Sequence, residues 1–114
     1  MVKLTGDGAM AEFATPSRAV LCAARLLRQL KELGVEVRAG VHTGEVERRR
    51  GDLNGVGVHI AARIMQMADG RHVLVSSTVK ELATGSGLKF EPWGTHKLRG
   101  LQGDWSLFRI RATP

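Results

Sequence analysis

Apolar residues repeat with helical spacing in residues 15–34, and both ends of this segment carry matching signals. Thr15 and Pro16 favour a helix start, because threonine caps exposed backbone N–H groups and proline fits the first turn. Gly34 favours a helix end, because glycine readily adopts the left-handed conformation that closes many helices. The segment therefore predicts an amphipathic helix, whose apolar stripe consists of Val20, Ala23, Leu27 and Leu30.

The rest of the chain alternates between short apolar runs and two further helical patterns, residues 54–70 and 77–84. Adjacent strand pairs dominate this order, which is typical of an α+β fold with a largely antiparallel sheet and helices over one face or at its ends. The run at residues 72–76 is almost continuously apolar, so we expect this strand to be buried. The predicted strands are residues 1–5, 9–13, 35–42, 45–48, 72–76, 89–98 and 105–110.

Three polar stretches lie between these strands. The first, "KLTGDGAMAEF" at residues 3–13, predicts a β-hairpin, because Asp-Gly supplies the positive φ angles of tight hairpin turns. "HTGE" at residues 42–45 predicts a second hairpin turn, and "RRRGD" at residues 48–52 predicts a charged loop.

Composition narrows the class of protein and of partner. The 114 residues suit a single domain, 1–114, with an ordinary 43% of hydrophobic and 25% of charged residues. The net charge of +6 favours anionic partners: nucleotides, nucleic acid or an acidic membrane surface. Aromatic residues make up only 4%, whereas single-stranded nucleic acid is usually bound by stacking on aromatic rings. We therefore expect no nucleic-acid partner.

Two further observations bear on the cellular compartment. No apolar run approaches the roughly 20 residues that span a bilayer, and no leader pattern opens the sequence. Cys22 is the only cysteine, so an internal disulfide cannot form, which favours a reducing environment. We expect a cytoplasmic protein without a membrane segment.

Residues that could bind a ligand or take part in catalysis occur in several clusters. Each cluster can also be explained by structure alone. Lys3 and Asp7 bracket the first turn, where a lysine and an aspartate are common as exposed turn residues. Asp52 precedes a glycine-rich helix start, and His59 and Arg63 follow four residues apart on one helix face. Taken alone, these three would be a capping region and a surface pair.

The last cluster is Lys97 and Arg99, which alone would be edge-strand charges that discourage aggregation. Taken together with the clusters described above, Lys97 and Arg99 suit the binding of a nucleoside triphosphate, because lysine and arginine neutralise phosphate oxygens. Arg63 adds a second guanidinium group. Asp7 offers the carboxylate oxygens that Mg²⁺ prefers. Lys3 as donor and Asp52 as acceptor match the edge of adenine.

The chain resembles the catalytic domain of class III nucleotidyl cyclases, the adenylate and guanylate cyclases, from about Val2 to Ile110. The resemblance implies a ferredoxin-like, nucleotide-cyclase sandwich. It rests on four stretches in order: "VKLTGDGAMAEF", "VRAGVHTGEVE", "GDLNGVGVHIAARI" and "HKLRGLQGDWSLFRI".

By this resemblance, Lys3 and Asp52 match the residues that read the purine, and they point to ATP. Arg99 matches the basic residue on the triphosphate. The implied reaction converts ATP into 3′,5′-cyclic AMP and pyrophosphate. It takes place at the interface of a head-to-tail homodimer.

The resemblance also assigns the groups nearest the reaction. Asp7 matches one of two aspartates that bind a pair of Mg²⁺ or Mn²⁺ ions. Arg63 matches the arginine that stabilises the transition state. His59 stands where many members have an asparagine that contacts the ribose, which is a departure from the family pattern.

The family domain normally opens with a strand and two helices that have no counterpart here, and that strand carries the other metal aspartate. We therefore expect an N-terminally truncated domain with impaired two-metal chemistry. The alternative is a degenerate, non-catalytic module that binds nucleotide or dimerises.

Overall fold

The fold is taken from a computed structural model of the chain. It describes residues 2–4, 8–44, 46–49, 52–68 and 72–112. For residues 2–4, 47–49, 52–54 and 112 the description covers the backbone alone. Along this part of the chain the elements are β1 (Val2–Leu4), β2 (Ala9–Ala11), α1 (Pro16–Glu32), β3 (Ala39–Val41), β4 (Glu47–Arg49), β5 (Asp52–Asn54), α2 (Val56–Gln66), β6 (Val73–Ser76), α3 (Ser77–Leu82), β7 (Lys89–His96) and β8 (Trp105–Ala112).

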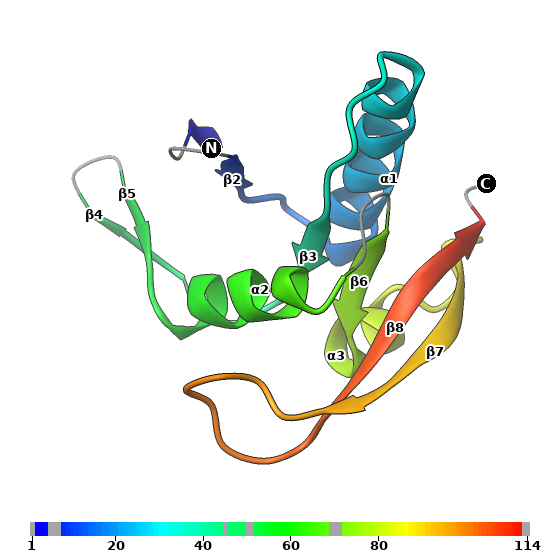
Figure 1. The fold of residues 1–114 in the computed structure, drawn as a ribbon. Coiled ribbons are helices and arrows are strands. Elements are labelled where there is room, and N and C mark those ends of the chain that lie inside the picture. The colour runs from blue at the N-terminus through cyan, green and yellow to red at the C-terminus, as the bar shows by residue number, and fades with distance from the viewer. Residues whose placement is uncertain (1, 5–7, 45, 50–51, 69–71, 113–114) are drawn as a thin grey trace.

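Four strands form the central sheet, in the order β3-β6-β8-β7 (Figure 1). β3 pairs in parallel with β6, whereas β8 pairs antiparallel with both β6 and β7. Two short antiparallel ribbons, β1-β2 and β4-β5, lie apart from this sheet on its β3 side in Figure 1. The α+β class and the largely antiparallel sheet are therefore confirmed.

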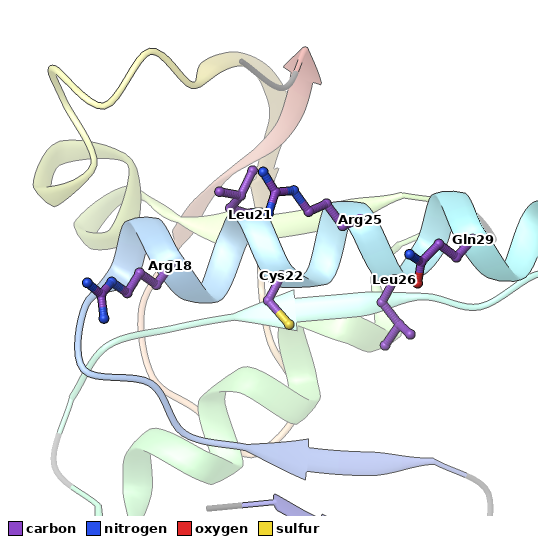
Figure 2. Close-up of a pocket in the computed structure, with 6 residues that line it drawn as sticks. All are labelled: Arg18, Leu21, Cys22, Arg25, Leu26 and Gln29. Carbon is purple, nitrogen blue, oxygen red and sulfur yellow. The ribbon is translucent and has the colours of Figure 1, made fainter.

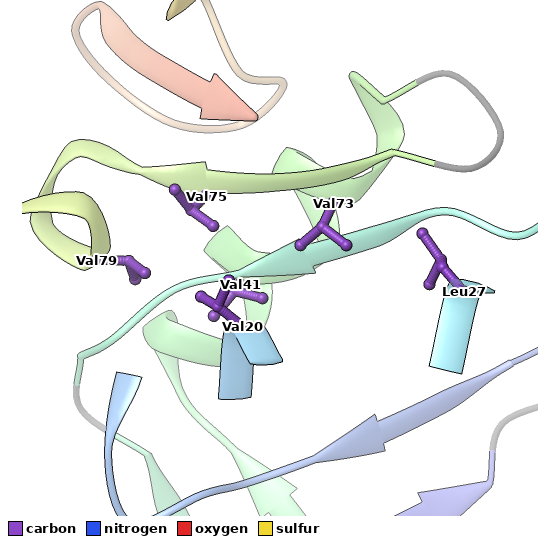
Figure 3. Close-up of a cluster of buried hydrophobic side chains, with 6 residues drawn as sticks. All are labelled: Val20, Leu27, Val41, Val73, Val75 and Val79. Atoms are coloured by element: carbon purple, nitrogen blue, oxygen red, sulfur yellow. The ribbon is translucent and has the colours of Figure 1, made fainter. Parts of the chain in front are cut away.

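One face of the sheet packs against α1 and α3 through a cluster rich in valine (Figure 3). Thr15 caps α1 as predicted, since its Oγ1 accepts a hydrogen bond from the backbone N–H of Arg18 at 3.2 Å. Gly34 follows the helix with φ of 79°. The buried members of the cluster are Val20, Leu27, Val41, Val73, Val75 and Val79.

The other face packs against α2. Gly40 of β3 permits this approach, because a Cβ at that position would overlap the backbones of Ala61 and Met65. Alternate residues of β6 point to opposite faces, so all four of its residues are buried, as predicted for this strand. The buried side chains under α2 are Ile60, Ile64, Ala68, Leu74, Leu98 and Leu107.

Helices therefore cover both faces of the sheet, and the expectation of helices on one face or at the ends is wrong. The reason lies in β6, whose apolar side chains point both ways and need cover on both sides. The antiparallel pairing of β7 with β8 and the short helix α3 are confirmed.

Two predicted connections are also wrong. The segment at 42–45 does not join a pair of neighbouring strands, because β3 pairs with β6 and β4 pairs with β5. Arg48, Arg49 and Asp52 of the predicted loop are strand residues of the β4-β5 ribbon, in which Arg49 lies opposite Asp52, and residues 50 and 51 lie outside the described part of the chain. Backbone hydrogen bonding can pair strands whose side chains are charged, and a charge pattern alone does not reveal this.

Candidate functional site

Helix α2 carries two of the predicted site residues, and the loop between β7 and β8 lies against it. α2 begins after Gly55, whose φ is 118°, and it presents the exposed His59 one turn before Arg63. A Cβ built on Gly100 of the β7-β8 loop would lie 3.5 Å from Nε2 of His59. The structure thus brings together His59 and the loop that contains Lys97 and Arg99.

Arg63 is half-buried and partly anchored. Its Nη1 donates a hydrogen bond to Oε1 of Gln66 at 3.1 Å. Its Nε is buried and has no hydrogen-bond partner. An external anion cannot reach the buried Nε, but the guanidinium has further N–H donors on its two terminal nitrogens, which suit contacts with an anion.

Lys97 and Arg99 are both exposed. Nζ of Lys97 lies 3.9 Å from Oδ1 of Asp104, and these side chains are 87% and 65% exposed. An ion pair this exposed is weak, so Lys97 remains available to an anionic ligand. The loop therefore presents positive charge beside α2.

Lys3 and Asp52 lie on the two ribbons. Lys3 is on β1 opposite Met10, which confirms the strand pairing of the first predicted hairpin. Asp52 is the first residue of β5, opposite Arg49, and not part of a capping loop before the helix. The side chains of Lys3 and Asp52, and the whole of Asp7, lie outside the described part of the chain.

The predicted metal site depends on Asp7. Among the described residues, no three His, Cys, Asp or Glu side chains lie close enough to hold a metal ion. The metal therefore stays a prediction from the sequence.

His42 is a polar residue of this region that the sequence interpretation missed. Its Nδ1 lies 2.8 Å from Oγ of the buried Ser76, and its ring meets the Trp105 ring edge-on, with 6.0 Å between centroids. Burial removes water from the ring and lowers the pKa of His42 below the usual 6.5. The available signal was a histidine directly after the buried Val41 at the end of β3, which the hairpin interpretation of residues 42–45 concealed.

A shallow groove lies on α1, on a different part of the molecule (Figure 2). It contains no residue of the predicted site. Leu21 and Leu26 contribute apolar side chains to its lining, and Arg18 and Arg25 contribute charged ones. Its lining consists of Arg18, Leu21, Cys22, Arg25, Leu26 and Gln29.

Comparison with protein families decides the class of protein. The family described as the adenylate and guanylate cyclase catalytic domain matches residues 7–112. The chain belongs to this family. The predicted resemblance to class III cyclases is therefore confirmed, and the match covers every helix of this cyclase domain.

Two relatives are named as adenylate cyclases. "Putative adenylate cyclase 3" of Rhizobium meliloti (strain 1021) is 32% identical over 109 residues, which are 88% of this chain and 19% of that protein. "pH-sensitive adenylate cyclase MT1302" of Mycobacterium tuberculosis (strain CDC 1551 / Oshkosh) is 37% identical over 79 residues, 66% of this chain and 20% of that protein. The cyclase domain thus spans about a fifth of these two curated relatives.

The solved structures confirm the cyclase fold. The adenylate/guanylate cyclase/hydrolase from Silicibacter pomeroyi superposes with a TM-score of 0.83 at 24% identity, over 97% of this chain and 70% of that chain. Within its described residues, this cyclase domain has no helix that is both long and apolar enough to cross a membrane.

Proposed function

We propose that this domain is an adenylate cyclase that converts ATP into 3′,5′-cyclic AMP and pyrophosphate. The observation that carries the proposal is the approach of Gly100, next to Arg99, to His59 on α2. It sets cationic and hydrogen-bonding groups from two distant segments side by side, as binding of a triphosphate requires. The two relatives named as adenylate cyclases support ATP as the substrate.

The described residues suit different parts of ATP. Arg99 and Lys97 bind the triphosphate, and His59 donates a hydrogen bond to the ribose. In the reaction the ribose 3′-oxygen loses its proton and attacks the α-phosphorus in line, and the bond to pyrophosphate breaks. Arg63, anchored by Gln66, offsets the negative charge that grows on the α-phosphate.

Recognition of adenine is proposed for Lys3 and Asp52. A lysine donates to the ring nitrogen N1, and an aspartate accepts from the exocyclic amino group. Guanine presents the opposite polarity at these two positions, so the same pair favours ATP over GTP. The support for this assignment is the donor and acceptor chemistry of the two residues.

The metal ion is proposed to be Mg²⁺ or Mn²⁺, bound by Asp7. Carboxylate oxygen is the ligand that these hard cations prefer, and the flanking Gly6 and Gly8 suit an exposed turn. When bound, the ion supplies positive charge for the nucleophile and the leaving group. We also propose a homodimer, in which Asp7 and Lys3 of one chain serve different sites.

Calorimetric titration with a non-cyclisable ATP analogue and Mn²⁺ tests substrate binding. Arg99→Ala should weaken binding about tenfold, because a charge-assisted contact is lost. Arg18→Ala on α1 is the matched control and should leave binding unchanged. A wild-type domain that binds neither the ATP analogue nor a GTP analogue would overturn the proposal.

Cyclic AMP formation tests the catalytic step. Arg63→Ala should lower the rate about 100-fold or more at saturating ATP, because the charge on the transition state loses its partner. Equal rates in Arg63→Ala and wild type would remove Arg63 from the mechanism.

A second candidate function is a cyclase-like module that binds nucleotide without turning it over. The replacement of the family's frequent asparagine by His59 favours it. The first function predicts a low rate of cyclic AMP formation, because the two-metal chemistry is expected to be impaired. Binding of the ATP analogue, with no trace of cyclic AMP from wild type in either Mg²⁺ or Mn²⁺, would support the second function over the first.

A further inference from the structure

His42 lies at the junction of several elements near the candidate site. The parallel register sets Gly40 opposite Leu74 and Val41 opposite Val75. Because side chains alternate along an extended chain, His42 lies on the same face of the sheet as Gly40, two residues before it. This is the face that α2 covers. The ring is therefore under α2, on the side of the sheet that carries His59.

The imidazole contacts side chains from two other elements. Nδ1 lies 2.8 Å from Oγ of Ser76, a residue only 1% exposed that caps α3 by accepting the N–H of Val79 at 3.4 Å. The ring meets Trp105 at the start of β8, with an angle of 78° between the ring planes. Trp105 in turn donates through Nε1 to the carbonyl of Gln102 at 3.1 Å. The β7-β8 loop is therefore connected to β3 through this ring.

The contact between Ser76 and His42 fits either tautomer of the neutral ring. The Ser76 oxygen accepts from Val79 and has a second lone pair. Nδ1 of His42 therefore either accepts the hydroxyl proton, with the ring proton on Nε2, or donates its own proton to Oγ. Burial favours this neutral state, because it lowers the pKa of His42.

The Nε2 edge of the ring faces the loop that follows β3. A Cβ built on Gly44 would lie 3.3 Å from Nε2 of His42 and 3.7 Å from Cα of Gly57 in the first turn of α2. The loop therefore folds back between the ring and the start of α2. Through Ser76, Gly44 and Trp105, the His42 side chain thus links the end of β3 with β6 and the start of α3, with the start of α2, and with the start of β8.

We propose that His42 is a positioning residue, whose neutral ring fixes the β7-β8 loop against α2. Through Trp105 and Gln102 it determines where Arg99 lies relative to His59. This inference rests on the proposed function in one respect only: the ligand that Arg99 binds is taken to be a nucleoside triphosphate. The placement of the loop itself is independent of that function.

Protonation of His42 should weaken the contacts that hold the β7-β8 loop against α2. A second ring proton turns both nitrogens into donors, and it puts a positive charge on a half-buried ring that contacts the uncharged side chains of Ser76 and Trp105. The other titratable group that faces Trp105 is His96, which lies opposite it across β7 and β8.

Arg63 of α2 and Arg109 of β8 are half-buried, whereas the charged groups of the β7-β8 loop lie at the surface. Lys97 and Asp104 form an exposed pair in the β7-β8 loop. Arg99 of the same loop and His59 of α2 are also exposed. Controls for a pH effect must therefore first distinguish protonation of His42 from protonation of His96.

Tryptophan fluorescence tests the protonation step without any ligand. The sequence has two tryptophans, so Trp93→Phe leaves Trp105 as the only emitter. Because an imidazolium ring quenches indole fluorescence, emission should fall on acidification with a midpoint below pH 6.5. The fall should persist in Trp93→Phe/His96→Asn and disappear in Trp93→Phe/His42→Asn. A fall that follows His96 instead would overturn the assignment.

Amide hydrogen exchange tests the positioning role. His42→Ala should speed exchange in residues 97–104 about tenfold, the effect expected for loss of about one hydrogen bond. His42→Asn, which keeps an acceptor near Nδ1, should restore much of the protection, and Gln29→Ala on α1 should change nothing. If His42→Ala does not fold, wild type compared at pH 7.5 and below the fluorescence midpoint makes the same test. Unchanged exchange in residues 97–104 would overturn the proposal.

Nucleotide binding separates this inference from the proposed function. In a domain that binds the ATP analogue, His42→Ala should weaken binding about tenfold. His42→Asn should bind the analogue nearly as tightly as wild type at neutral pH, and its affinity should not fall at acid pH as that of wild type does. A wild-type domain that binds no nucleotide disproves the proposed function, while the fluorescence and exchange results still decide the role of His42.

Discussion

The two faces of the central sheet differ in chemistry, although the same strands supply both. Under α1 and α3 the buried side chains are five valines and a leucine. Under α2 the aliphatic cluster is bordered by polar and aromatic groups, including the His42–Ser76 pair and an ion pair of Arg109 with Glu91. The face with mixed chemistry is also the face that carries the candidate site. The comparison suggests that the valine face mainly stabilises the fold, while the α2 face also positions functional groups.

The largest expected effect comes from removing the contact between β3 and α2. Gly40→Ala should lower the free energy of unfolding by about 3 kcal/mol, because its Cβ meets helix backbone that cannot move aside easily. Gly44→Ala is the milder control, since its Cβ meets mainly the His42 side chain. Chemical denaturation measures both. Equal stability of Gly40→Ala and wild type would show that α2 does not depend on this contact.

A cavity in the valine face should cost stability without affecting the site. Leu27→Ala should destabilise the domain by about 2 to 3 kcal/mol, because a side chain only 6% exposed leaves a void. At temperatures where the variant is folded, the Trp105 fluorescence titration should match that of wild type. A shifted fluorescence midpoint would mean that the two faces are coupled.

A smaller effect is expected from pH, and it belongs to the α2 face alone. Since the pKa of His42 is lowered in the folded state, the unfolded chain binds more protons between that pKa and 6.5. The contribution of His42 to stability is therefore complete above pH 6.5 and declines as the pH falls toward the lowered pKa. Denaturation of wild type and His42→Asn should give curves that diverge in this window. Parallel curves would contradict the prediction.

The smallest effect is expected at the surface of the same face. Lys97→Ala breaks the exposed contact with Asp104 and should change stability by less than about 0.5 kcal/mol. Binding of the ATP analogue should still weaken, with a greater loss at low than at high salt. Equal weakening at all salt concentrations would argue against a direct charge interaction of Lys97.

Much of the fold could be predicted, because some elements carry their signals locally. Thr15, Pro16 and Gly34 mark the ends of α1, and the apolar run around Leu74 marks the buried strand β6. The β4-β5 ribbon could not be predicted in this way. Its pairing of Arg49 with Asp52 depends on backbone hydrogen bonds, which a charged sequence does not display.

The candidate site was predictable to a lesser extent. Helical spacing was enough to put His59 and Arg63 on one face of α2. The approach of Gly100 to His59 depends on tertiary packing between segments about 40 residues apart, which local sequence patterns do not display. His42 was missed because its partners, Ser76 and Trp105, are also distant in sequence.

The position of Cys22 has a practical consequence for the proposed homodimer. It is the sole thiol of the sequence, it is exposed, and it lies on α1 (Figure 2), which packs on the face of the sheet opposite to α2. A nitroxide attached there gives one spin label per chain, so any dipolar coupling between labels must come from two associated chains. The single cysteine that excludes an internal disulfide thus allows the distance between two copies of the domain to be measured.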